Sequence, residues 1–111
     1  MAYFFVYETK DFPLKIVKNG EGEGKVLEGY EKIIVSLKQG TTLIEKDETK
    51  LGIDVENDII NLHLSQEETG AFSTLEQVKL QVNIYYTDTE RDTSQETYID
   101  VYDNLHKEIM P

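Results

Sequence analysis

Residues 77–86 read Gln-Val-Lys-Leu-Gln-Val-Asn-Ile-Tyr-Tyr, and this stretch decides the fold of the 111-residue chain. Its apolar side chains occupy every second position from Val78 to Tyr86, and polar or amphipathic ones lie between them. Because successive side chains of an extended strand point to opposite faces, this spacing predicts a strand with one apolar face. Burying that row contributes roughly 10 kcal/mol gross. Ordering the backbone costs about 1–2 kcal/mol per residue, so the strand needs a second sheet facing it.

The composition indicates one domain and excludes several classes of partner. A chain of 111 residues can bury one modest core, so we expect a single domain over residues 1–111. Acidic residues outnumber basic ones 22 to 11, and the net charge is −11. Such a field repels phosphate groups, so we expect neither nucleic acid nor a membrane surface as partner. Without Cys, neither a disulfide framework nor a thiolate metal site can form.

Shorter stretches repeat the alternating, β-branched or aromatic pattern and predict further strands, at residues 2–8, 12–18, 31–38, 41–45, 51–55, 59–64 and 97–102. Pro13 cannot donate a ladder hydrogen bond, which places its strand at an edge or at a strand start. The brief stretch 41–45 is expected to be another edge strand. Asn57 and Asp58 tolerate positive φ, so the strands around them form a hairpin. The last strand should pair antiparallel with residues 77–86.

Local signals place one short helix between the hairpin and the central strand. Ser65 and Glu68 have the spacing of a capping box, and Gly70 limits the length of the helix, so we expect a helical turn near residues 66–72. The Gly- and Glu-rich residues 19–24 predict an exposed loop, and residues 104–111 predict a flexible or partner-docked tail. Many short strands with one helical turn describe an all-β sandwich or barrel.

No set of residues predicts catalysis or a cofactor. His63 and His106 are the chain's two histidines; the first is expected on an exposed strand face and the second in the tail. The two are not expected to meet, and the sequence indicates neither the three or more N or S ligands of a zinc site nor a triad in which a base lies near a Ser or Cys and an orienting carboxylate. The acidic runs 54–58 and 88–92 offer oxygen ligands for Ca²⁺, but they lack the ligand spacing of a calcium loop, and we interpret them as solvated turns.

Three tyrosines are candidates for a contact surface. Strand parity allows Tyr85, Tyr98 and Tyr102 to face outward. An exposed aromatic row serves either as a protein contact surface or as a platform on which sugar rings stack. We favour protein contact, or packing in the core, over sugar binding.

Four segments together resemble a group of small bacteriophage and prophage virion proteins. They are Glu8-Thr9-Lys10-Asp11-Phe12-Pro13-Leu14-Lys15-Ile16, the Leu27-Glu28-Gly29 turn with the strand to Lys38, the stretch Ile60–Thr69 containing Leu64-Ser65-Gln66-Glu67-Glu68-Thr69, and the terminal strand ending in Ile99-Asp100-Val101. The resemblance covers nearly the whole chain. One departure is Glu8-Thr9-Lys10-Asp11, which stands where the group has an Arg-Gly-Asp type of opening.

The resemblance implies a single immunoglobulin-like antiparallel β-sandwich. It also implies a non-enzymatic structural or adaptor protein of a tail, baseplate or head, found in the virion or in the host cytoplasm before assembly. Its partners would be other virion proteins or copies of itself, and a small-molecule ligand is not expected. Sheet edges, formed by the first strand or by residues 41–46, would offer a physical route to such pairing. The alternative is a carbohydrate-binding β-sandwich module that uses the exposed tyrosines.

Overall fold

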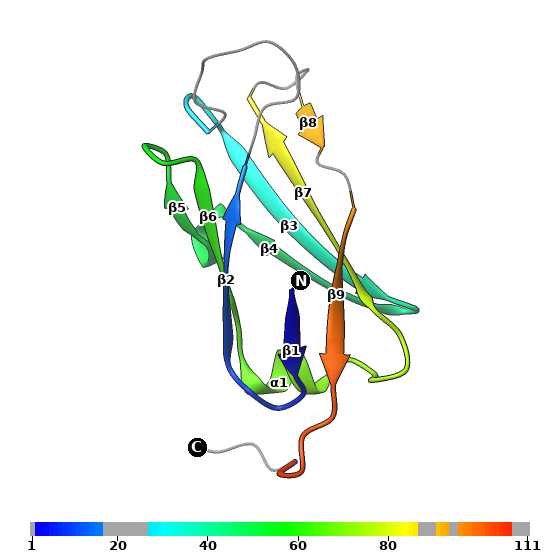
Figure 1. Cartoon of the computed structure of the whole chain (residues 1–111). Coiled ribbons are helices and arrows are strands. Elements are labelled where there is room, and N and C mark those ends of the chain that lie inside the picture. Colours follow the sequence, from blue (N-terminus) through cyan, green and yellow to red (C-terminus); the bar gives the residue numbers. More distant parts are fainter. Residues whose placement is uncertain (1, 17–26, 87–90, 94–95, 108–111) are drawn as a thin grey trace.

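The computed structural model describes residues 2–16, 27–86, 91–93 and 96–107. These residues form nine strands, one α-helix and one 3-10 turn (Figure 1). The elements are β1 (Tyr3–Phe5), β2 (Lys10–Lys15), β3 (Lys32–Gln39), β4 (Thr42–Asp47), η1 (Glu48–Lys50), β5 (Gly52–Asp54), β6 (Ile59–Leu64), α1 (Gln66–Gly70), β7 (Val78–Tyr85), β8 (Arg91–Thr93) and β9 (Thr97–Tyr102). The predicted all-β fold is confirmed.

The strands form two sheets that face each other across the core. The larger sheet has the order β1-β9-β7-β3-β4, with β8 also paired to β7, and the smaller sheet has the order β2-β6-β5. By chain order, the smaller sheet corresponds to strands B, E and D of an immunoglobulin sandwich, and β9, β7, β3 and β4 correspond to G, F, C and C′. Every pairing is antiparallel except that of β1 with β9, which is parallel.

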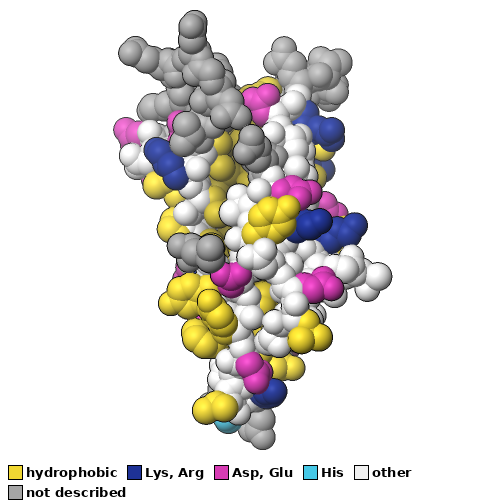
Figure 2. All heavy atoms as spheres, turned by 45° about the vertical axis from the view of Figure 1, so that its right-hand side comes forward, with side chains coloured by type: hydrophobic (Ala, Val, Ile, Leu, Met, Phe, Trp, Pro, Cys, Tyr) yellow, Lys and Arg dark blue, Asp and Glu magenta, His cyan; other side chains and the backbone are white. Residues whose placement is uncertain are grey.

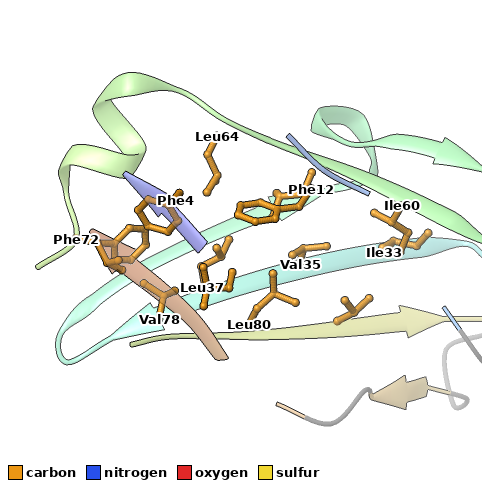
Figure 3. Packing of buried hydrophobic residues seen from close by; sticks show 14 of the residues in the cluster. Phe4, Phe12, Ile33, Val35, Leu37, Ile60, Leu64, Phe72, Val78 and Leu80 are labelled. Atoms are coloured by element: carbon orange, nitrogen blue, oxygen red, sulfur yellow. The ribbon is translucent and has the colours of Figure 1, made fainter. Parts of the chain in front are cut away.

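Strand β7 lies at the centre of the larger sheet, between β3 and β9, as its alternation predicts. Its residues Val78, Leu80, Val82 and Ile84 are buried, and the residues between them are exposed or half-buried. Figure 3 shows side chains from both sheets meeting in one core, among them Phe12 from the smaller sheet and Val35 from the larger. The period-two pattern therefore identified the core face of the central strand correctly.

The hairpin and the helix are explained by local chemistry. Strands β5 and β6 pair antiparallel, and Asp58 in the turn between them has a φ of 54°, which Asp tolerates. At α1 the amide of Glu68 donates to Ser65 Oγ at 3.2 Å, and the amide of Ser65 donates to Glu68 Oε1 at 2.9 Å. This is the predicted capping box, and the helix ends at Gly70.

Some predicted boundaries were wrong. The first strand covers only Tyr3–Phe5 rather than residues 2–8, because the chain turns at Tyr7, whose φ is 65°. Arg91–Thr93, expected to belong to the polar connection between the last two strands, instead forms a strand against β7. The predicted loop at residues 19–24 and part of the predicted tail, residues 108–111, lie outside the described residues.

Candidate contact surface

Three aromatic side chains gather on the outer face of the larger sheet, where β1 pairs with β9. Tyr3, Phe5 and Tyr102 are 44%, 39% and 48% exposed, and we call them the aromatic cluster. Their ring centroids are 5.6 to 6.0 Å apart, in edge or tilted geometries. Rings at these separations and angles attract each other by about 0.5–1.5 kcal/mol per pair beyond area burial. The three rings therefore form a pre-arranged apolar surface that still faces water.

The parallel register of β1 and β9 builds this cluster. Phe5 lies beside Tyr102, and the intervening residue Phe4 lies beside Val101. Because side chains alternate, Phe4 and Val101 enter the core, where both are buried, and their neighbours face outward. The ammonium of Lys10 lies 4.8 Å from the centroid of the Tyr3 ring, a cation–π contact at the border of the cluster.

Figure 2 shows how hydrophobic side chains are distributed on one face of the molecule. They form several separate groups among acidic, basic and other polar atoms, and the largest lies in the lower half of the view. That is the height at which Figure 1 places β1 and the end of β9. Exposed apolar residues scattered singly are normal, whereas a contiguous group marks a candidate interaction site.

Strand β1 forms one border of the larger sheet, but its free edge is partly occupied. The amide of Phe5 donates to Glu8 Oε1 at 2.8 Å, and the amide of Glu8 donates back to the carbonyl of Phe5 at 3.3 Å. The peptide groups that an added strand would use at Phe5 are thus already bonded. Because β1 has three residues and these bonds occupy its free edge at Phe5, it is a poor template for the addition of another strand.

Strand β4 forms the other border and carries a charge that points inward. The ammonium of Lys46 lies 2.8 Å from Glu68 Oε1 and 2.5 Å from the carbonyl oxygen of His63, and its side chain is 11% exposed. An inward-pointing charge is one of the features by which natural edge strands resist pairing with another chain. The predicted edge position of residues 41–45 is confirmed, while the structure argues against this edge as a site of strand addition.

The borders of the smaller sheet are protected as well. The amide of Ile16 donates to the carbonyl of Asp58 at 2.9 Å, continuing the β2–β6 register. Because bonding alternates along an antiparallel ladder, Pro13 then faces the free edge of β2, where its missing N–H removes a donor. At the other border, β5 has three residues. Across the described strands, side chains offer a better contact surface than sheet edges.

The three predicted tyrosines do not form one surface. Tyr102 belongs to the aromatic cluster, and Tyr98 is 47% exposed on the same face of β9, separated from it by Asp100. Tyr85 is half-buried, with the Arg91 guanidinium 5.7 Å from its ring centroid. From the register, Tyr85 and Tyr102 lie about ten residues apart along the strand direction, or roughly 33 Å.

Sequence reasoning missed Tyr3 and Phe5 as surface residues. The aromatic opening stretch predicts a strand, and its outward-facing rings were not distinguished from its inward-facing ones. The alternation itself contains the missing information. In a strand through residues 3–5, burial of Phe4 requires Tyr3 and Phe5 to face away from the core. The partner in space, Tyr102, could not be identified from the sequence, because the parallel pairing joins the two ends of the chain.

The polar residues considered as candidates in the sequence, two histidines and two acidic runs, lie in separate parts of the fold as far as the structure describes them. No group of three or more His, Asp or Glu residues suited to a metal occurs among the described residues. His63 is exposed, as predicted, with its Nδ1 2.6 Å from Asp11 Oδ1 on the neighbouring strand, and His106 follows β9. In the acidic turn at 54–58, Asp54 accepts hydrogen bonds from the amide and side chain of Asn57. Of the second acidic run, Asp88 and Glu90 lie outside the described residues, and Asp92 lies in β8.

Three described carboxyl groups have shifted pKa values, and each shift is explained by local structure. Hydrogen bonds from the Thr49 hydroxyl and amide lower the pKa of Asp47, and those from the Asn57 side chain and amide lower that of Asp54. Burial alone would raise the pKa of Glu68, but hydrogen bonds from Lys46 and the Ser65 amide outweigh it and lower the pKa. A catalytic general acid needs the opposite shift. Asp47 caps the start of the 3-10 turn, Asp54 stabilises the turn between β5 and β6, and Glu68 completes the cap of α1.

A shallow groove of about 480 Å³ lies on the outer face of the larger sheet, and none of its lining residues belongs to the aromatic cluster. It is lined by residues of β3, β4 and β7 and by the segments that precede β7 and β9: Ser36, Lys38, Gln39, Gly40, Leu43, Glu76, Gln77, Lys79, Gln81 and Glu96. Tyr98 stands beside it, because its register partner is Lys79. Apart from Leu43 and Gly40, the lining residues have polar or charged side chains, and the groove is partly open to solvent.

Comparison of the chain with known protein families and with curated proteins gives no match. Among the described residues, no helix is long and apolar enough to cross a membrane. The geometry of the surface therefore carries the functional conclusion.

Proposed function

We propose that this chain is a non-enzymatic structural or adaptor protein that works by protein–protein contact through the aromatic cluster. The observation that supports this most directly is three mutually packed aromatic rings, each 39–48% exposed, on a fold whose sheet borders resist strand addition. The resemblance to small phage and prophage virion proteins supplies the setting that we propose, a tail, baseplate or head assembly. The partner there is another virion protein or a second copy of the chain.

The exposed area of the cluster suits the centre of an interface. With about 200 Å² per aromatic side chain, the three exposed fractions leave roughly 260 Å² for a partner to cover. Covering it contributes about 6–7 kcal/mol gross, before the cost of association. A stable interface buries about 800 Å² on each side, so the partner must also cover neighbouring polar residues. Tyr and Phe at the centre of a polar rim is the usual composition of such a contact.

The negative charge of the chain limits the kind of surface that a partner can present. A net charge of −11 opposes close approach of a second acidic surface, so the surface that meets the cluster is neutral or basic. Two rim charges, Asp100 on β9 and Lys10 beside Tyr3, lie next to the aromatic rings. Association with a different virion protein is thus favoured over self-association.

Co-purification tests the proposal. The tagged chain is co-expressed with each protein encoded beside it, and any captured pair is measured by calorimetry. The variant Tyr3→Ala/Phe5→Ala/Tyr102→Ala is expected to lose capture, whereas Leu75→Ala, an exposed leucine outside the cluster, is expected to keep it. Equal affinity of the triple variant and the wild type, with both folded by circular dichroism, would contradict the proposal. Light scattering of the isolated chain reports self-association separately.

A second candidate function, carbohydrate binding, is favoured by Tyr98. Its ring is 47% exposed beside the groove, and its hydroxyl lies 3.3 Å from Glu96 Oε2, so the ring is held at the border of a polar depression. A sugar ring can stack there while its hydroxyls bond to the lining. Tyr98→Ala is expected to abolish glycan retention with a nearly unchanged thermal midpoint, whereas Tyr98→Phe should preserve it, and Tyr85→Ala, which lies outside the groove, should also preserve it. Retention by Tyr98→Ala would exclude this candidate.

A further inference from the structure

The groove contains two lysines that face each other across the centre of the sheet. Lys38 on β3 and Lys79 on β7 are register partners, and both are exposed and line the groove. Directly opposed residues have Cβ atoms about 4.5–5.5 Å apart, and like charges in this position destabilise the sheet. The placement is unusual in a chain that has twice as many acidic as basic residues. A bound anion would relieve the repulsion.

Neither the Lys38 nor the Lys79 ammonium forms an ion pair or hydrogen bond with a described residue, although the carboxylates of Glu76 and Glu96 also line the groove. Lys46, in contrast, is bonded to Glu68. Nearby polar groups are already engaged: Ser36 Oγ donates to Glu45 Oε2 at 3.1 Å, and the side-chain amide of Gln77 donates to Asp100 Oδ1 at 2.7 Å. The two ammonium groups therefore present donors to the groove that an external ligand can use.

The remaining lining limits the charge and shape of the ligand. Glu76 and Glu96 also border the groove, so it holds two cations and two carboxylates. Together with the net charge of −11, these carboxylates oppose a dianion such as a phosphate monoester more strongly than a monoanion. They also accept hydrogen bonds, which suits a ligand carrying hydroxyl groups. Tyr98, the next residue of the cross-strand row beyond Lys79, offers a flat apolar face.

We infer that this groove binds a sugar acid, with its single carboxylate between Lys38 and Lys79, hydroxyls on Glu76 or Glu96, and its ring against Tyr98. Charge-assisted hydrogen bonds from two ammonium groups hold the carboxylate. The volume of about 480 Å³ admits one or two sugar rings, since pockets for small ligands span about 300–1,000 Å³. The inference rests on the second candidate function and names its ligand class; it is independent of the aromatic cluster.

NMR titration of the full chain with four probes tests this. The probes are a galacturonate trimer, a neutral galactose trimer, a glutamate tripeptide and inorganic phosphate. The galacturonate trimer is expected to shift the amides of β3 and β7 around Lys38 and Lys79 and to bind at least about tenfold more tightly than the other three. Lys38→Ala/Lys79→Ala should weaken it about tenfold or more. Lys32→Ala, on the same face of β3 but outside the groove, should not change it.

Each other outcome overturns part of the inference. Equal binding of the neutral trimer, unaffected by the lysine variants, would refute the carboxylate contact and leave carbohydrate binding standing. If the glutamate tripeptide or phosphate binds as tightly as the galacturonate trimer, the groove attracts anions in general and does not select a sugar acid. Binding of none of the probes would overturn the groove as a site and carbohydrate binding with it. Folding is checked by the thermal midpoint, which should not fall in the double lysine variant, because removing opposed like charges relieves repulsion.

Discussion

Replacement of Lys46 by Ala tests whether the inward charge of strand β4 ties the two sheets together. The Lys46 ammonium reaches from the larger sheet to Glu68 in α1 and to the carbonyl of His63 at the end of β6. The same Glu68 oxygen accepts from the amide of Ser65 and so completes the helix cap. One side chain thus links an edge strand, a strand of the opposite sheet and a helix start. We expect Lys46→Ala to destabilise all three together.

The partial exposure of the Lys46–Glu68 pair determines how much stability Lys46→Ala should remove. Breaking a fully buried ion pair costs about 3–5 kcal/mol, because the remaining charge stays unpaired. The Glu68 side chain is 26% exposed and keeps its bond to the Ser65 amide, so water compensates for part of the loss. We therefore expect the free energy of unfolding to fall by about 1–3 kcal/mol. Lys38→Ala removes an exposed lysine from the neighbouring strand and should change it by less than about 0.5 kcal/mol.

Urea denaturation of a double-mutant cycle measures the coupling. The cycle uses Lys46→Ala, Glu68→Gln and both together, and a coupling energy of about 0.5–3 kcal/mol is expected for residues in direct contact. A change below about 0.5 kcal/mol for Lys46→Ala, or equal costs of Glu68→Gln in both backgrounds, would refute the reasoning.

Three further predictions concern pH, the helix and the core. The pKa of Glu68 is lowered from 4.5 in the folded chain, so the stabilisation by its ion pair is present above pH 4.5 and is lost as the pH falls through the folded pKa. The difference in unfolding free energy between wild type and Lys46→Ala should therefore shrink on acidification. A constant difference from pH 7 to about pH 3 would contradict this prediction. Gly70→Ala places a Cβ against the Tyr7 ring and should cost about 1–3 kcal/mol, whereas in a Tyr7→Ala background the same change should stabilise the chain by about 0.5–1 kcal/mol, because Ala is the better helix former. Leu80→Ala should cost about 2–5 kcal/mol, while its outward neighbour Lys79→Ala should stay within about 0.5 kcal/mol; equal costs would mean that the faces of β7 are assigned the wrong way round.

Local patterns predicted the elements whose structure depends on nearby residues. The alternation from Val78 to Ile84 identified the core face of β7, because burial acts on every second side chain of a strand. The cap at Ser65 and Glu68 was predictable because both partners lie within one helical turn. Pro13 indicated an edge strand through its missing donor, and β2 lies at a border of the smaller sheet.

Features that depend on contacts between distant residues could not be predicted in the same way. The parallel pairing of β1 with β9 joins Tyr3 to Asp100, and no short-range signal encodes it. The aromatic cluster exists only because of that pairing, so the sequence predicted Tyr102 as a surface residue together with Tyr85 and Tyr98, and missed its actual neighbours Tyr3 and Phe5. Likewise, the polar stretch that includes Arg91 gave no strand signal, and its pairing with Tyr85 depends on the position of β7.

Amide hydrogen exchange of the chain, alone and bound to a partner captured by co-purification, tests the central claim most directly. If the aromatic cluster is the working surface, binding should slow exchange in β1 and at the end of β9 around Tyr102, and leave β4 and β2 unchanged. Protection confined to the strand borders at β4 or β2, with no change at β1 and β9, would contradict the account.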